Sequence, residues 1–287
     1  MSVATASVRS VASMCEVLAL ASRIAVTETA LLIEGETGTG KGVLATVIHQ
    51  RSPRRLQPLH VLDCGVLAAG LRSGDLFGQV AADCTGLARR SGGLDHGAGT
   101  LLLDEVGTLP PDLQRALLRV LDQRTVRRIG ADGVHRVDVR VIATASGDLR
   151  AEVRAGRFRA DLYQRLAVVR LPMPALRERR GEIPRLVAAF LAGEGAEAPA
   201  AVLAAFEAHL WPGNVRELRS VVEHQKLLGW ASALEAFQIA RPMAGDTSPI
   251  AHLGEAERAA LLRFEEDHRA FRLGRPRRMR ELSGDRR

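Results

Sequence analysis

Residues 35–42 read GETGTGKG, a glycine-rich stretch with the spacing G-x-x-x-x-G-K. That spacing is typical of a P-loop, whose backbone amides surround phosphate groups. The apolar stretch ALLIE (30–34) precedes it and VLATVIHQ (43–50) follows it. This pattern predicts a buried strand, the loop and then a helix whose N-terminal amides point at a phosphate. Gly42 stands where a serine or threonine that helps to hold magnesium usually follows the lysine.

Lys41 is the strongest single indication of a nucleotide site. Among the 40 basic residues only Lys41 and Lys226 are lysines, so a lysine at the required position would be a rare coincidence. We expect Lys41 to neutralise the β and γ phosphates of ATP and the whole P-loop to contact the nucleotide. The P-loop consists of Gly35, Glu36, Thr37, Gly38, Thr39, Gly40, Lys41 and Gly42. The alternative is a glycine-rich turn that carries a lysine by chance.

Two adjacent carboxylates, Asp104 and Glu105, end the apolar stretch TLLLDE (100–105). In parallel α/β sheets this carboxyl edge is where ligands bind. Asp104 is predicted to bind Mg²⁺ directly or through water, so magnesium does not require a hydroxyl at position 42. Glu105 is predicted to orient and deprotonate the attacking water. The alternative is a solvated strand end, which is less common for a pair of acids after three leucines.

The order of the remaining segments indicates an α/β protein followed by helices. Strands are expected at 58–64, 100–106 and 137–146, with helices at 14–25 and 110–123. Between them, a hairpin is expected around Asp132-Gly133. Strands that alternate with helices favour a parallel sheet flanked by helices. From Ile183 to about residue 240 the patterns are helical only, and a last helix is expected at 255–271.

Composition restricts the class of protein further. The three cysteines are far apart and form no metal or disulfide pattern, which fits a reducing compartment. No apolar run is long enough for a membrane helix, and charged residues interrupt the N-terminus, so no signal peptide is expected. A cytoplasmic protein without a membrane partner is therefore predicted. The net charge of +7 favours a polyanionic partner, although the basic residues are spread along the chain.

Several further stretches together resemble the sigma-54-dependent transcriptional activators, which are AAA+ ATPases of the NtrC type. They occur in the family's order and spacing over roughly residues 13–228: DLFG (75–78), GTLLLDEV (99–106), PPDLQRALLRVL (110–121), GRFRADLYQRL (156–166), PALRERRGEIPRL (174–186) and WPGNVREL (211–218). The resemblance implies an AAA+ P-loop NTPase fold with a small all-α lid domain. It implies an N-terminal extension (1–13), an ATPase domain (14–172), a lid domain (173–242) and a linker with a basic tail (243–287).

The resemblance also implies roles for three arginines. Arg159 and Arg165 resemble arginine fingers that reach the γ-phosphate bound by a neighbouring subunit, where a guanidinium stabilises transition-state charge. Arg216 resembles a lid arginine that senses the bound nucleotide. Fingers supplied by a neighbour imply that the chain assembles with itself in a hexamer-like ring. Because arginine is abundant in this chain, the bland alternative for each is a solvated surface residue.

One loop, one residue and one pair of residues depart from the family's pattern. The loop that contacts sigma-54, usually centred on GAFTGA, is here Ala82, Asp83, Cys84, Thr85, Gly86 and Leu87. It lacks the aromatic anchor that would carry much of such an interface. Asp63 replaces an asparagine and is expected to face Glu105, repelling it or sharing a proton with it. Ala145-Ser146 replaces Thr-Asn, with the expected loss of one polar contact near the γ-phosphate.

The ends leave further alternatives open. Only about a dozen residues precede the expected ATPase domain, so no sensor domain is expected within this chain. Residues 269–287 contain eight arginines and two acids, which suits non-specific contact with DNA phosphates or a solvated tail. The leading prediction is an ATP-hydrolysing transcriptional regulator that acts as a ring on RNA polymerase. The alternative is a nucleotide-binding protein that does not hydrolyse ATP, does not engage sigma-54, and serves as an assembly partner or inhibitor of intact family members. A metabolic kinase leaves the finger and WPGNVREL stretches unexplained.

Overall fold

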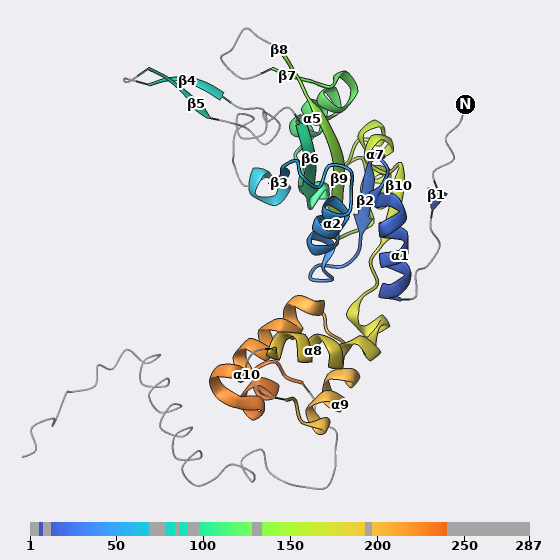
Figure 1. The fold of residues 1–287 in the computed structure, drawn as a ribbon, viewed down its shortest axis with the longest axis vertical. Coiled ribbons are helices and arrows are strands. Elements are labelled where there is room, and N and C mark those ends of the chain that lie inside the picture. The colour runs from blue at the N-terminus through green and yellow to red at the C-terminus, as the bar shows by residue number, and fades with distance from the viewer. Residues whose placement is uncertain are drawn as a thin grey trace, which may run out of the picture.

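The computed structural model describes residues 6–7, 13–68, 79–83, 86–90, 98–127, 134–192 and 197–239. Its main sheet has the strand order β1-β10-β2-β9-β6-β3, and all neighbours run parallel (Figure 1). The strands are β1 (Ala6–Ser7), β2 (Leu31–Glu34), β3 (Leu59–Asp63), β6 (Ala98–Asp104), β9 (Asp138–Ala145) and β10 (Val169–Pro172). The prediction of a parallel α/β sheet is confirmed.

Helices cover both faces of this sheet, which explains why its central strands are apolar throughout. Successive side chains of β2 enter different cores: Leu31 and Ile33 pack with α1 and α2, whereas Leu32 faces the core of α5 and α7. The helices of this part are α1 (Met14–Ala25), α2 (Lys41–Gln50), α3 (Cys64–Ala68), α5 (Pro111–Gln123), α6 (Leu149–Arg154) and α7 (Ala160–Leu166), with the 3-10 turn η1 (Val106–Thr108).

Two short antiparallel pairs lie apart from the main sheet (Figure 1). β4 (Gln79–Asp83) pairs with β5 (Gly86–Arg90), so Ala82, Asp83, Gly86 and Leu87 of the expected partner loop belong to a hairpin. β7 (Thr125–Arg127) pairs with β8 (Val134–Arg136), as the hairpin prediction required. Cys84, Thr85 and the expected turn at Asp132-Gly133 lie outside the described residues.

A helical part follows the sheet and has its own core. It contains the 3-10 turns η2 (Leu176–Glu178) and η3 (Arg180–Glu182) and the helices α8 (Ile183–Leu191), α9 (Ala200–Ala208) and α10 (Asn214–Ala236). Trp211 is fully buried at its centre, where the indole N–H donates to Phe206 O at 2.7 Å and the rings of the two residues meet edge to face. The exact boundaries between the parts stay predictions.

The C-terminal segment cannot be compared with its predictions, because residues 240–287 lie outside the described residues. This applies to the helix expected at 255–271 and to the arginine-rich tail. Within the described part of the chain, no helix combines the length and the apolar character needed to cross a membrane.

Candidate functional site

The order of the strands brings three distant segments to one edge of the sheet. β2 lies beside β9, and β9 lies beside β6. Since the strands are parallel, their carboxyl ends meet, and the segments that follow them become neighbours. The P-loop follows β2, Glu105 follows β6, and Ser146 follows β9. This edge therefore gathers the phosphate-binding stretch and the predicted catalytic carboxylates.

The P-loop turns through left-handed backbone at two glycines. Gly38 has φ +81° and Gly40, the N-cap of α2, has φ +103°, a region that favours glycine. A Cβ on Gly38 would lie 2.1 Å from the Gly213 carbonyl oxygen, so the helical part packs directly on the loop. A Cβ on Gly42 would meet no atom within 4 Å. Gly42 is therefore not required by the turn.

Lys41 is the first residue of α2, and its ammonium bonds back to carbonyl groups at the beginning of the P-loop. Its side chain is only 5% exposed, and its ammonium donates to Gly35 O at 2.9 Å and Glu36 O at 3.2 Å. It also donates to Ser146 Oγ at 2.7 Å and lies 3.1 Å from Glu105 Oε1. The lysine and the glutamate predicted from separate motifs thus form one ion pair.

Ser146 has a role in the site that the sequence did not predict. Its hydroxyl donates to Glu105 Oε1 and accepts from Lys41 and, at 2.9 Å, from Thr37 Oγ1, which uses the full capacity of a hydroxyl. Its backbone N–H donates to Glu105 Oε2 at 2.9 Å. The expected loss of a polar contact at Ala145-Ser146 is therefore offset by a serine that joins the P-loop to Glu105. Only the strand order, which places β9 between β2 and β6, could have indicated this.

Asp104 and Glu105 are held in different ways. Thr144, fully buried on β9, donates to Asp104 Oδ1 at 2.5 Å and accepts from Glu105 N at 2.9 Å. Glu105 has φ +55°, an unusual conformation for a non-glycine residue and one often found at functional sites. This turn directs the Glu105 carboxylate toward Lys41 and Ser146, while Asp104 remains on the strand.

Asp63 accepts hydrogen bonds from the beginning of the helix that follows it. Its Oδ1 accepts from Gly65 N at 2.9 Å and Val66 N at 3.1 Å, so it satisfies the first amides of α3. Glu105 is engaged by Lys41 and Ser146 instead. The adjacent Cys64 thiol is buried, and burial together with the charges of Asp104, Asp63 and Glu105 raises its pKa to about 12. Cys64 is thus an inert thiol beside the site.

The helical part contacts the P-loop through charged and polar side chains. Arg177 NH1 donates to Glu36 Oε2 at 2.8 Å, and its NH2 pairs with Glu36 Oε1 at 2.5 Å. Asn214, fully buried, donates to Glu36 Oε2 at 3.1 Å and Thr37 O at 3.0 Å. The hydrogen bonds from Arg177 and Asn214 lower the pKa of Glu36 to about 2. Arg216 N donates to Gly38 O at 3.3 Å, which places the predicted nucleotide-sensing arginine beside the loop.

Arg159 and Arg165 occupy a different location. Arg159 is the N-cap of α7 and its guanidinium pairs with Asp161 at 2.7 Å, while Arg165 pairs with Asp122 at 2.6 Å. Both side chains are exposed, at 42% and 58%. In the part of the chain that the structure describes, their ion pairs involve neither the P-loop nor the two carboxylates after β6. The ion pairs of these two arginines are thus with acidic residues of α7 and α5.

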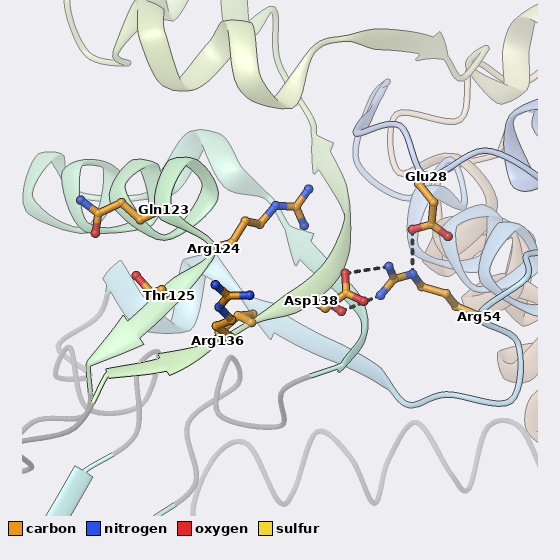
Figure 2. A pocket seen from close by; sticks show the side chains of 8 residues that line it. Glu28, Arg54, Gln123, Arg124, Thr125, Arg136 and Asp138 are labelled. Atoms are coloured by element: carbon orange, nitrogen blue, oxygen red, sulfur yellow. Dashed lines mark hydrogen bonds and ion pairs between the residues drawn. The ribbon is translucent and has the colours of Figure 1, made fainter.

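A hollow of about 650 Å³ lies near the beginning of β9, at the end of the strands away from the P-loop (Figure 2). It is lined by Glu28, Arg54, Gln123, Arg124, Thr125, Arg136, Val137 and Asp138. Arg54 donates to Glu28 Oε2 at 2.7 Å and to Asp138 Oδ1 at 2.9 Å, as Figure 2 shows. It also donates to the Gly99 carbonyl at 3.1 Å. These bonds make Arg54 a brace between the beginnings of β6 and β9.

Comparison with known proteins agrees with this geometry. Residues 8–172 match the Sigma-54 interaction domain and residues 177–249 match the AAA+ ATPase lid domain. The chain belongs to the sigma-54 interaction domain family. It is 38% identical over 255 residues to the transcriptional regulatory protein ZraR of Escherichia coli K12, covering 85% of this chain and 57% of ZraR. It is 44% identical over 213 residues to the C4-dicarboxylate transport transcriptional regulatory protein DctD of Rhizobium meliloti, covering 71% of this chain and 46% of DctD.

A solved structure shares the fold. NtrX from Brucella abortus in complex with ATP is 30% identical, with a TM-score of 0.67 over 93% of this chain and 62% of NtrX. The expected AAA+ P-loop fold is thereby confirmed. The chain spans about half the length of the curated relatives it matches.

Proposed function

We propose that this chain binds and hydrolyses ATP to drive the regulation of transcription by an oligomeric ring. The observation that carries the proposal is the junction of Lys41, Glu105 and Ser146 at the N-terminus of α2, beside Asp104. A buried cation, a helix N-terminus and two carboxylates at one sheet edge suit phosphoryl transfer, which depends on positioning and charge. The ATP complex of NtrX supports the choice of nucleotide.

The residues present fit ATP and Mg²⁺. The left-handed Gly38 and Gly40 carry no side chain that could block phosphate, and the first turn of α2 carries no acidic residue that would repel it. Asp104 supplies one oxygen ligand for Mg²⁺. Among the described residues no cluster of three or more metal-ligating side chains exists, so the remaining ligands would be phosphate oxygens and water, as magnesium prefers. When bound, magnesium would neutralise charge on the β and γ phosphates.

The chain's own groups divide the chemistry between them. Lys41 binds the β and γ phosphates, and Glu105 orients the attacking water and accepts its proton. Arg216 senses the nucleotide from the helical part. Arg159 and Arg165, remote from their own P-loop, supply positive charge to the γ-phosphate of a neighbouring subunit. Each active site is then complete only at an interface between two copies, which makes the ring a requirement for turnover.

The target proposed is RNA polymerase that carries sigma-54. The match to the Sigma-54 interaction domain supports this choice. The β4–β5 hairpin, with the segment Ala82–Leu87 at its end, is the proposed contact. The arginine-rich tail at 269–287 adds non-specific contact with DNA phosphates that weakens as salt rises.

The test is the ATP hydrolysis rate per subunit, measured against protein concentration. The wild-type rate is expected to rise with concentration as rings assemble. Glu105→Gln and Arg159→Ala are each expected to lower turnover by at least about 100-fold while ATP still binds. Lys41→Ala is expected to abolish ATP binding.

Matched controls are Glu207→Gln on α9 and Arg185→Ala on α8, both exposed side chains of the helical part. Both controls should hydrolyse ATP at the wild-type rate. ATP binding without any turnover in the wild-type protein would contradict the proposal. It would favour the alternative function, a nucleotide-gated assembly partner or inhibitor of intact family members.

A further inference from the structure

Gln114 is a buried polar residue to which the proposed chemistry assigns no role. It lies on α5 and is 1% exposed. Its side-chain nitrogen donates to Leu109 O at 2.8 Å and to Arg157 O at 3.1 Å, and its Oε1 accepts from Arg159 N at 2.9 Å. The amide therefore uses both donor hydrogens and one acceptor position on backbone groups of two separate segments.

The first of these segments leads back to the catalytic glutamate. Leu109 follows η1, the turn that begins directly after Glu105. Glu105 O accepts from Thr108 N at 3.0 Å, and Leu109 N donates to Val106 O at 3.2 Å. The carbonyl that Gln114 holds thus belongs to a short hydrogen-bonded turn that starts at Glu105.

The second segment carries the proposed arginine finger. Arg157 and Arg159 flank Phe158, which is 2% exposed and fixes the segment in the core. The Arg159 guanidinium extends to the surface, where its partner is Asp161 on the same helix. Helix α5 also carries Asp122, which pairs with Arg165. Both proposed fingers are therefore attached to the helix that holds Gln114.

We propose that Gln114 is a positioning residue for the arginine finger. It fixes the Arg159 backbone so that the guanidinium reaches the nucleotide of a neighbouring subunit, while its bond to Leu109 O holds the Gln114 amide itself in place. This inference rests on the proposed function, since it requires a finger supplied to another copy. A purely structural role would instead damage the subunit's own ATP site and its stability.

A positioning role and a purely structural role of Gln114 predict defects in different ATP sites. Gln114→Met keeps the volume of the side chain and removes its hydrogen bonds. A shift of about 1 Å in a catalytic group can lower turnover roughly 100-fold, so turnover should fall by that order while ATP affinity stays the same. The defect should lie in the sites of neighbouring subunits and not in the variant's own site.

Mixing of subunits reveals where the defect lies. Equal amounts of Gln114→Met and Lys41→Ala are combined, so that intact fingers of Lys41→Ala can serve the intact P-loops of Gln114→Met. Turnover of the mixture is expected to exceed the sum of the separate proteins by about tenfold. A mixture of Gln114→Met with Arg159→Ala should show no gain. Gln123→Met changes an exposed glutamine on the same helix. Without any mixing, this variant should hydrolyse ATP at the wild-type rate.

Two results would overturn the inference while leaving the proposed function intact. One is wild-type turnover of Gln114→Met alone, and the other is no gain on mixing although Arg159→Ala and Lys41→Ala do restore each other. If that reference pair also fails, the finger in trans and the inference fall together. Gln114→Asn, whose amide is one methylene shorter and would not span Leu109 O, Arg157 O and Arg159 N together, is mixed in the same way in case Gln114→Met does not fold, and it should also be restored by Lys41→Ala.

Discussion

At the residue scale, the site depends on one small hydroxyl. Ser146 connects Thr37 and Lys41 of the P-loop with Glu105, and its partners include both members of an ion pair. Hydrogen bonds to charged groups contribute about 1.5–3 kcal/mol each, more than those between neutral groups. Ser146 therefore holds Glu105 at a position where the sequence suggested the loss of one polar contact.

Ser146→Ala is expected to lower ATP turnover by roughly 10- to 100-fold, which corresponds to the loss of one hydrogen bond to a charged group. ATP affinity should change far less, because Lys41 and the P-loop amides remain. Steady-state kinetics and nucleotide titration measure the two effects. Ser22→Ala on the exposed face of α1 is the control, and equal losses of affinity and turnover in Ser146→Ala would argue against an orienting role.

At the scale of elements, the helical part is attached to the loop between β2 and α2. Glu36 is the centre of this attachment, because Arg177 and Asn214 both donate to its carboxylate. Arg177 also belongs to η2, the first turn of the helical part. A charge pair thus links the P-loop to the element that begins the helical part.

The contacts of Glu36 with Arg177 and Asn214 make the free energy of unfolding depend on pH. Because the pKa of Glu36 falls from 4.5 to about 2 on folding, its ionised form stabilises the protein above about pH 4.5, and this contribution disappears as pH falls toward 2. Since Glu36 is 43% exposed, solvent screening limits the contribution to about 1 kcal/mol. Glu36→Gln should therefore lower the free energy of unfolding in urea near neutral pH.

The difference between wild type and Glu36→Gln should shrink as the pH of the urea titrations is lowered from about 5 to about 3. Glu207→Gln on α9 serves as the matched control and should show no such pH-dependent difference from wild type. A Glu36→Gln deficit that stays constant over this range would mean that the lost contact is not electrostatic.

At the scale of the whole molecule, a buried asparagine joins two hydrophobic cores. Asn214 is the only asparagine of the chain, and its φ of +53° places it in the left-handed region. Its Oδ1 accepts from Leu176 N at 2.8 Å, while its amide donates to Glu36 and Thr37. One side chain therefore connects the start of the helical part, the start of α10 and the P-loop.

Asn214→Ala is expected to cost about 3 kcal/mol, because buried hydrogen bonds are lost and partners are left unsatisfied. It should also uncouple the two cores. Both tryptophans, Trp211 and Trp230, lie in the helical part, so their fluorescence follows that part alone. In urea, the fluorescence midpoint of the variant should fall below the circular-dichroism midpoint.

In the wild-type protein and in Ser220→Ala, an exposed change on α10, the fluorescence and circular-dichroism midpoints should coincide. If the two midpoints of Asn214→Ala move together, Asn214 stabilises the fold but does not couple its two cores.

The sequence alone determined the elements and the class of chemistry. Residues close together in the chain decide these features, since strand, P-loop and helix follow from apolar patterns and glycine spacing within residues 30–50. Lys41, Asp104 and Glu105 could be predicted in this way. The residues that the sequence missed, Ser146, Thr144 and Gln114, act through contacts between segments more than 30 residues apart in the chain. Only the parallel order β2-β9-β6 and the packing of α5 bring them together.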